Sequence, residues 1–438
     1  MNVREINDLL SRGDIDHEEL WPHLLDLKKQ AVTFNFEFGL KKLPIEPGLI
    51  IIRGPRQYGK STWLELHLKQ TIQSFKKGSA YYINGDEIST HEDFFEELII
   101  LNNAFSKDVP VKRIFIDEVT AIIDWEKALK RAWDQGFLRD VLIITTGSKA
   151  RDLRRGIEKL PGRKGKLPKN EYIFLPISYK EFHTSCSHKL KSKTLVSYLL
   201  TGGSPIVCNE MYSHERIPEY CIQLIRDWIL GEIVSSGRSR ISLHNVFNVI
   251  FKYGGQAVGY AKLAREAGLA NNTVASGYIE QLVDLLSLLP SWQWDQNTKN
   301  LQIRKPCKFN FINLAAAIAF HPSTIRTVHE FETLPDTLQA LFLEWIVAQE
   351  IWRRSILADS STPESLGFWK SDEHEIDFIT PQETFIEVKK GKAGPLDFLW
   401  FNKVFPKKKL LVICKTPFET NQITGITLED FLVDETIV

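Results

Sequence analysis

The sequence has few cysteines, no net charge and no long apolar run. Its five cysteines among 438 residues are scattered, with no C-x-x-C pair. We therefore expect a protein of the reducing cytosol, without a disulfide framework or a cysteine zinc site. Lys+Arg and Asp+Glu both number 55, so any nucleic-acid surface has to be local. Neither the charged N-terminus nor any apolar stretch fits a signal peptide or a membrane span, which predicts a cytoplasmic protein without membrane contact.

The stretch 49–62 organises the rest of the chain. An apolar run leads into a loop of the form G-x-x-x-x-G-K-S/T, which consists of Gly54, Pro55, Arg56, Gln57, Tyr58, Gly59, Lys60, Ser61 and Thr62. The glycines let main-chain N–H groups surround phosphate oxygens, Lys60 would reach the β- and γ-phosphates, and the Ser61 hydroxyl would ligate Mg²⁺. Apolar residues at helical spacing predict a following helix, whose positive end faces the phosphates. ATP and Mg²⁺ are therefore the predicted ligands, and a glycine turn that binds nothing is the alternative.

Short apolar runs alternate with helical stretches from 49 to 177. The strand candidates are Leu49–Arg53, Ala80–Asn84, Arg113–Asp117, Val141–Thr146 and Tyr172–Leu175. Nearly continuous apolar runs are typical of strands that are buried on both faces of a parallel sheet. The alternation predicts a doubly wound α/β domain.

Polar residues follow two of these runs. Asp117 and Glu118 end the third run, at the carboxyl end where α/β sheets bind their ligands. We predict that Asp117 holds Mg²⁺ and that Glu118 orients and deprotonates the attacking water; an ordinary strand end is the alternative. After the fourth run, Thr146, with Ser148 next, could sense the γ-phosphate or hold the water. A threonine that hydrogen-bonds its own loop is an equally open interpretation.

Residues 149–169 form a basic stretch, with nine Lys or Arg against two acidic residues and a local charge of +7. Such a stretch could provide an arginine to the ATP of a neighbouring subunit or bind a nucleic-acid backbone. A solvated loop is the alternative.

A second group of charged residues lies between 335 and 415. Glu344 is on a predicted helix and Asp377 on a predicted strand, while Glu387 and Lys389 are two apart on the next strand and share a face. If they converge, the carboxylates bind one or two Mg²⁺ ions, with Asp377 and Glu387 as ligands, and Lys389 steadies the nucleophile or the phosphate. Glu350, on the same helix as Glu344, is the alternative helix carboxylate. The competing interpretation is a charged pair on an edge strand of an inert domain.

The motifs GPRQYGKST, IFIDEV, TTGS, PGR and LPISYKEF occur in this order, followed by Gly202–Pro205. Together they resemble a group of prokaryotic AAA-type ATPases. The resemblance implies that Arg163, in the PGR motif, is the arginine finger or its sensor equivalent, acting in cis or in trans. The later blocks FLEWIVAQE, FWKSDEHEIDFI and FIEVKKG resemble a variant of the PD-(D/E)XK nuclease superfamily that is often fused to such ATPases. That resemblance implies nuclease activity, with Glu344 as the first-helix glutamate.

The sequence thus predicts an α/β protein of five parts. They are an N-terminal helical segment at 1–36, a P-loop AAA-type ATPase domain at 37–185, a helical lid at 186–238, a winged helix at 239–330 and a restriction-endonuclease-like domain at 331–438. In a DNA-binding winged helix, Asn272, Thr273 and Ser276 would face base edges. Winged helices also act as protein-binding or spacer modules.

The predicted function is ATP binding and hydrolysis, with the nucleotide state controlling the nuclease-like domain and double-stranded DNA as a candidate partner. The alternative is an ATP-driven switch that assembles protein partners or copies of itself. In that alternative the C-terminal domain is a recognition module that does not cut.

Overall fold

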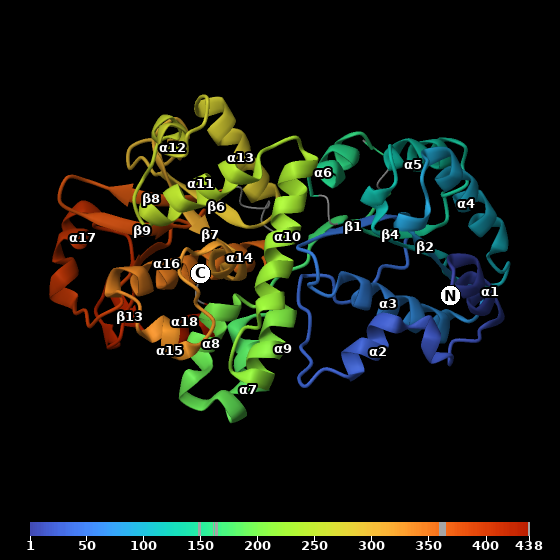
Figure 1. Cartoon of the computed structure of the whole chain (residues 1–438), viewed down its shortest axis with the longest axis horizontal. Coiled ribbons are helices and arrows are strands. Elements are labelled where there is room, and N and C mark those ends of the chain that lie inside the picture. The colour runs from blue at the N-terminus through green and yellow to red at the C-terminus, as the bar shows by residue number, and fades with distance from the viewer. Residues whose placement is uncertain (148–149, 161, 163–164, 359–364, 437–438) are drawn as a thin grey trace. The chain divides into compact units, whose positions relative to one another are not determined.

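The computed structural model describes residues 1–147, 150–160, 162, 165–358 and 365–436. The chain divides into two compact units, Met1–Leu175 and Pro176–Val438 (Figure 1). None of the helices in these described ranges combines the length and the apolarity that a membrane crossing needs.

A five-stranded parallel sheet forms the centre of the first unit. Its strands are β1 (Gly48–Arg53), β2 (Ala80–Asn84), β3 (Arg113–Asp117), β4 (Leu142–Gly147) and β5 (Glu171–Ile173). They pair in the order β2-β3-β4-β1-β5, and every pairing is parallel. The predicted α/β fold with a parallel sheet is confirmed. Because β4 lies between β1 and β3, the carboxyl ends of these three strands meet at one edge of the sheet.

Helices cover both faces of this sheet. The helices of this unit are α1 (Val3–Arg12), α2 (Pro22–Lys28), α3 (Lys60–Phe75), α4 (His91–Ala104), α5 (Trp125–Asp134) and α6 (Ala150–Glu158). Figure 1 shows α3 below the sheet and α4, α5 and α6 above it. Leu49 and Ile51 of β1 point into the core that α4 and α5 close. Their neighbours Ile50 and Ile52 are equally buried and point the other way, because successive side chains alternate across a strand.

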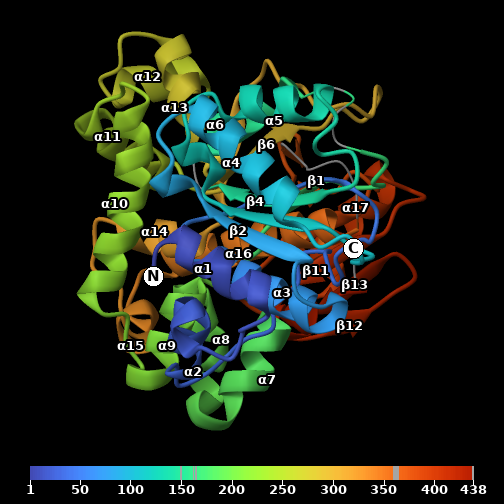
Figure 2. The ribbon, with the colours of Figure 1, turned by 90° about the vertical axis from the view of Figure 1, so that its right-hand side faces the viewer.

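Helix α1 closes the open edge of the sheet along β2 (Figure 2). The Asn7 side chain donates through Nδ2 to the carbonyl of Tyr82 and accepts through Oδ1 from the N–H of Tyr82, both at 2.8 Å. An edge strand leaves such backbone groups unpaired. The amide of Asn7 therefore stands in for a neighbouring strand, and the first helix of the N-terminal segment is a fixed part of this unit.

The second unit is largely helical in its first half. Its helices are α7 (Tyr179–Leu190), α8 (Thr194–Thr201), α9 (Pro205–His214), α10 (Glu219–Ser235), α11 (Arg240–Lys252), α12 (Tyr260–Glu266), α13 (Asn272–Asp284), α14 (Leu314–Phe320), α15 (Val328–Glu332), α16 (Asp336–Leu357), α17 (Leu399–Val404) and α18 (Leu428–Val433). Asn271 caps the start of helix α13, since the N–H of Val274 donates to Oδ1 of Asn271 at 2.9 Å.

A mixed sheet of eight strands runs through this unit. The strands are β6 (Leu288–Gln293), β7 (Cys307–Phe311), β8 (Leu366–Lys370), β9 (Glu375–Ile379), β10 (Phe385–Val388), β11 (Leu410–Ile413), β12 (Phe418–Glu419) and β13 (Ile423–Ile426). Their order is β12-β13-β11-β10-β9-β8-β6-β7. The hairpin β6–β7 comes from the stretch expected to form a winged helix, and β6 pairs in parallel with β8. The segment 292–304 is the far end of this hairpin, with a bridge from Trp294 to Leu301.

Candidate functional sites

The phosphate-binding loop lies between β1 and the first turn of α3. Gly59 ends the loop with φ 99°, a left-handed conformation that favours glycine. A Cβ at this position would lie 2.7 Å from the ring of Phe36, so the close approach also requires glycine. Among the described residues, no side chain caps the start of α3. Its first N–H groups therefore remain available to an anion.

Lys60 is buried at the start of α3. Its Nζ donates to the carbonyl oxygens of Gly54 at 3.0 Å and Pro55 at 2.8 Å. Burial lowers the pKa of this ammonium, and the nearby carboxylates of Glu118 and Asp117 oppose that shift. The loop thus holds a buried cation through uncharged oxygens.

Asp117, Glu118 and Thr146 meet where β3 and β4 end. The hydroxyl of Thr146 donates to Oδ1 of Asp117, which is buried. The N–H of Glu118 lies 3.1 Å from Oγ1 of Thr146 and 3.2 Å from Oδ1 of Asp117. Thr146 therefore orients the carboxylate of the neighbouring strand.

Glu118 itself has φ 49° and ψ 49°, a left-handed conformation that costs a residue other than glycine about 1–3 kcal/mol. Gly85 faces this backbone, because a Cβ at residue 85 would lie 2.3 Å from the Glu118 carbonyl oxygen. Strain of this kind at a strand end is a feature of functional sites.

The structure gathers a donor set that suits a nucleotide with its metal. Ser61 and Thr62 provide hydroxyls in the first turn of α3, Asp117 provides a carboxylate, and Lys60 provides an ammonium. Hydroxyl and carboxylate oxygens are ligands that Mg²⁺ prefers, and N–H and ammonium groups bind phosphate oxygens. Arg163 and Ser148, named from the sequence, lie outside the described residues.

A second site forms in the other unit, where Asp377 of β9 meets Glu387 of β10. Oδ2 of Asp377 accepts from the N–H of Val388 at 2.9 Å, and Oε2 of Glu387 accepts from the N–H of Asp377 at 3.3 Å. Nζ of Lys389 lies 2.5 Å from Oε1 of Glu387. The structure therefore brings together Asp377, Glu387 and Lys389.

Two further charged residues, Lys308 and Glu375, belong to this cluster and were not identified from the sequence. Lys308 lies on β7 and is 3% exposed, with its ammonium 3.3 Å from Oδ1 of Asp377 and in contact with Glu375. The carboxylates of Asp377 and Glu375 raise the pKa of Lys308 although burial acts against the charge. In the sequence, the signal for Lys308 was a lysine between the apolar residues Cys307 and Phe309. Only the order of the strands shows that its side chain reaches Asp377.

Glu344 of α16 completes the cluster. Burial, with Asp377 nearby, raises the pKa of Glu344 to about 8, while Lys308 and Lys389 act against the shift. The pKa of Glu387 is raised for the same first reason, burial. Within the described ranges, no three His, Cys, Asp or Glu side chains gather in a way that could hold a metal ion. Among the described residues, the ion pairs of the cluster join carboxylates to the ammonium groups of Lys308 and Lys389.

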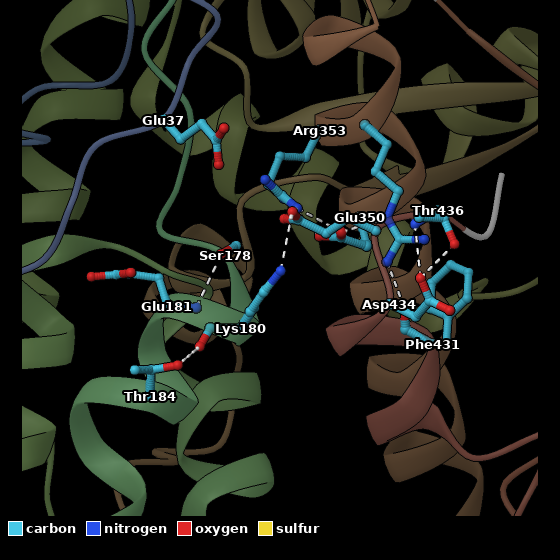
Figure 3. Close-up of polar contacts among 12 residues, drawn as sticks. Glu37, Ser178, Lys180, Glu181, Thr184, Glu350, Arg353, Phe431, Asp434 and Thr436 are labelled. Carbon is cyan, nitrogen blue, oxygen red and sulfur yellow. Dashed lines mark hydrogen bonds and ion pairs between the residues drawn. The ribbon is translucent and has the colours of Figure 1, made fainter. Parts of the chain in front are cut away.

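Glu350, named above as the alternative to Glu344, lies in a different network (Figure 3). Its carboxylate accepts from Nε of Arg353 at 2.8 Å and from Nε of Arg354 at 2.6 Å. Arg353 also contacts Glu435 at 2.6 Å, and Arg354 contacts the carbonyl of Phe431. Both arginines are buried. Glu350 is therefore used to fasten the C-terminal segment to α16, and the alternative assignment is wrong.

Comparison with known proteins assigns a domain type to the part of the chain that contains the first site. Residues 46–183 match the family model described as an AAA domain, and this part of the chain is an AAA-type P-loop ATPase domain. The chain is also 26% identical over 237 residues to the uncharacterized protein MJ1544 of Methanocaldococcus jannaschii, covering 50% of this chain and 51% of that protein. The chain thus spans about half the length of the curated relative that it matches.

Two solved structures match this chain at low identity and with TM-scores below 0.5. The Walker-type ATPase PABY2304 of Pyrococcus abyssi is 14% identical with a TM-score of 0.44, covering 70% of this chain and 95% of that one. The ORC2 protein of Aeropyrum pernix, in ADPNP–ADP complexes, is 13% identical with a TM-score of 0.38, covering 80% and 95%. The assignment of the ATPase domain rests on the family model.

Proposed function

We propose, from the AAA-type ATPase domain within residues 46–183, that the protein binds ATP with Mg²⁺ and hydrolyses it to ADP and phosphate. The observation that carries this proposal is the junction of the P-loop with Asp117, Glu118 and Thr146 at one edge of the sheet. Ser61 and Asp117 are the residues that would hold Mg²⁺, whose charge, when bound, offsets that of the phosphates.

The residues of the loop and of β3 would divide the work. Lys60 and the N–H groups of the first turn of α3 bind the phosphate oxygens. Glu118 orients a water molecule and takes its proton while the water oxygen bonds to the γ-phosphorus and the bond to the bridging oxygen breaks. Thr146 keeps the Asp117 carboxylate in place. We assign to Arg163, from the same or a neighbouring subunit, the stabilisation of negative charge on the γ-phosphoryl group as it is transferred to water.

Two variants test the ATPase proposal. Lys60→Ala should lose nucleotide binding, measured by calorimetry with ATP and Mg²⁺. Its matched control is Lys69→Ala on the same helix, whose side chain lies over the Trp21 ring. Glu118→Gln should bind ATP but hydrolyse it at least about a hundredfold more slowly, with the exposed Glu87→Gln as control. Normal turnover by both Lys60→Ala and Glu118→Gln would contradict the proposed site.

We also propose that the nucleotide state controls the second unit. This unit begins at Pro176, shortly after β5, and β5 pairs directly with the strand that leads into the P-loop. A shift at the phosphates therefore has a short route to the second unit, across the hydrogen bonds between β1 and β5 and then along the chain. Hydrogen exchange of α7 and α8 should differ between protein with ADP and Glu118→Gln with ATP. Identical exchange in both states would remove the coupling from the proposal.

The second unit has two candidate actions on double-stranded DNA. Cleavage is favoured by the convergence of Glu344, Asp377, Glu387 and Lys389, and recognition without cleavage by the ammonium groups that the same carboxylates already contact. Plasmid incubated with Mg²⁺ or Mn²⁺, with and without ATP, separates the two. The first action, cleavage, is supported if the Lys389→Ala variant no longer cuts the plasmid while the Lys409→Ala variant still does. Binding without cleavage supports the second, and the absence of both leaves only the protein-assembling switch.

A further inference from the structure

The cluster around Asp377 and Glu387 contains its own buried cation. Lys308 reaches it from β7, an edge strand of the sheet, and not from the strands that carry the carboxylates. The ammonium is buried, contacts Glu375 and Asp377, and lies 5.4 Å from the centroid of the Phe368 ring. A buried ammonium is costly unless carboxylates surround it. Its position is therefore determined by the acidic cluster.

The two carboxylates expected to hold a metal have partners on all four oxygens. Asp377 uses Oδ1 for Lys308 and Oδ2 for the N–H of Val388. Glu387 uses Oε1 for Lys389 and Oε2 for the N–H of Asp377. A divalent ion on these oxygens would lie against the Lys308 ammonium, and like charges at that distance repel strongly in a buried site. In this arrangement the residues do not fit a resident metal.

We propose that Lys308 is the built-in cation of this cluster, so that the C-terminal site binds the phosphodiester backbone of DNA without a divalent metal and does not cut it. Lys308 contacts Asp377, one of the two carboxylates expected to hold the metal. Lys389, whose side chain is 48% exposed, is the cation that can reach a phosphate from the same cluster. That the ligand is DNA rests on the proposed function. That no metal is bound rests on the contacts of Lys308.

The test uses Mn²⁺ alone as the probe, with nucleotide-free full-length protein, and follows binding by calorimetry and electron paramagnetic resonance. The wild type should show no Mn²⁺ binding that depends on Asp377. Lys308→Met should create such a site, at least roughly tenfold tighter than any in the wild type, and Asp377→Asn in the same background should remove it. Lys370→Met is the matched control, because Lys370 also contacts Glu375, at 2.6 Å, but is exposed.

Two results would overturn the inference. One is Mn²⁺ binding by the wild type that Asp377→Asn abolishes, and the other is a folded Lys308→Met that gains no site. Circular dichroism shows whether Lys308→Met folds. If it does not fold, two comparisons still test the inference. Lys308→Arg keeps the positive charge and should bind no Mn²⁺, and the wild type should bind no more Mn²⁺ than Asp377→Asn.

DNA binding is measured separately by fluorescence anisotropy with a labelled duplex in EDTA. We expect binding that EDTA leaves unchanged and that Lys389→Ala weakens severalfold. Binding that requires a divalent metal would count against the inference. If no DNA binds under any condition, the proposed action on DNA fails, while the Mn²⁺ titration still reports whether Lys308 replaces a metal.

Discussion

Each unit has a buried lysine at its candidate site, and the two lysines are held in opposite ways. The ammonium of Lys60 is held by carbonyl oxygens of Gly54 and Pro55, and burial lowers its pKa. The ammonium of Lys308 contacts carboxylates of Glu375 and Asp377, which raise its pKa in spite of burial. Neutral acceptors leave a lysine ready to attract an arriving anion. Carboxylate partners neutralise it, so that it acts as a fixed part of the structure.

The sharpest way to break this comparison is to remove each charge. Lys308→Met removes the ammonium partner of the buried Asp377 carboxylate and should lower the free energy of unfolding of its unit by about 3–5 kcal/mol. Lys60→Met leaves only carbonyl oxygens unpaired and should lower the free energy of unfolding of its unit by about 1 kcal/mol. Hydrogen exchange measured by mass spectrometry reads the two units separately, through peptides from β9 and from α3. Equal losses in both units would show that the two lysines are not held differently.

The Glu350 network offers a second comparison, between a carboxylate that only stabilises and those of the cluster. Glu350→Ala leaves the buried guanidinium groups of Arg353 and Arg354 without their anion. The unit should lose about 3 kcal/mol of stability, seen as faster exchange in α18, while DNA binding by the remaining folded protein stays unchanged. The exposed Glu332→Ala is the control. Weakened DNA binding in folded Glu350→Ala would place Glu350 in the functional cluster after all.

A smaller effect is expected at the ATPase site from Thr146→Val. The variant removes the hydroxyl that donates to Asp117 but keeps the shape of the side chain. Hydrogen bonds to a charged group contribute about 1.5–3 kcal/mol, so ATP turnover should fall roughly tenfold or more. Thr145→Val is the matched control, since Thr145 is buried on the same strand and its hydroxyl lies 3.3 Å from the Thr146 carbonyl oxygen. Equal turnover in the two variants would assign Thr146 a structural role only.

The mildest test is the dependence of stability on pH. Burial raises the pKa of Glu344 to about 8 from an ordinary value of 4.5. Between these values the folded protein keeps a proton that the unfolded chain has released, so stability falls as pH rises through this window. Below the window both states are protonated, and above it the loss is complete. Glu344→Gln should make the profile of thermal unfolding less steep between pH 5 and 8, and Glu387, whose pKa burial also raises to about 8, accounts for slope that remains. An unchanged slope would show that Glu344 does not contribute.

Most of the predictions for the ATPase domain came from residues that are close together along the chain. The P-loop is a contiguous motif, and the runs that form β2 and β3 end at the residues predicted for them. Asp117 was placed because a buried strand delivers its last residue to a known edge of the sheet. The contact of Thr146 with Asp117 was open, because it depends on β4 lying beside β3, which no local pattern specifies.

The carboxylate cluster shows the other case. The sequence identified Glu387 and Lys389 because residues two apart on a strand share a face, and it named Asp377 on the preceding predicted strand as a residue that can join them. It left Glu344 and Glu350 as alternatives, since both lie on one helix and only packing decides which faces the sheet. It missed Lys308, whose position follows from the parallel pairing of β6 with β8.

By itself the sequence determined the phosphate-binding loop, the parallel α/β sheet around it and the carboxylates of the second unit. These depend on backbone conformation, burial and side-chain alternation, which act between near neighbours along the chain. Tertiary structure decided which cation each carboxylate meets, because strand order brings Lys308 to Asp377 across 69 residues. Electrostatic interactions depend on the distance between charges in space, and the sequence pattern alone does not give that distance for residues far apart along the chain.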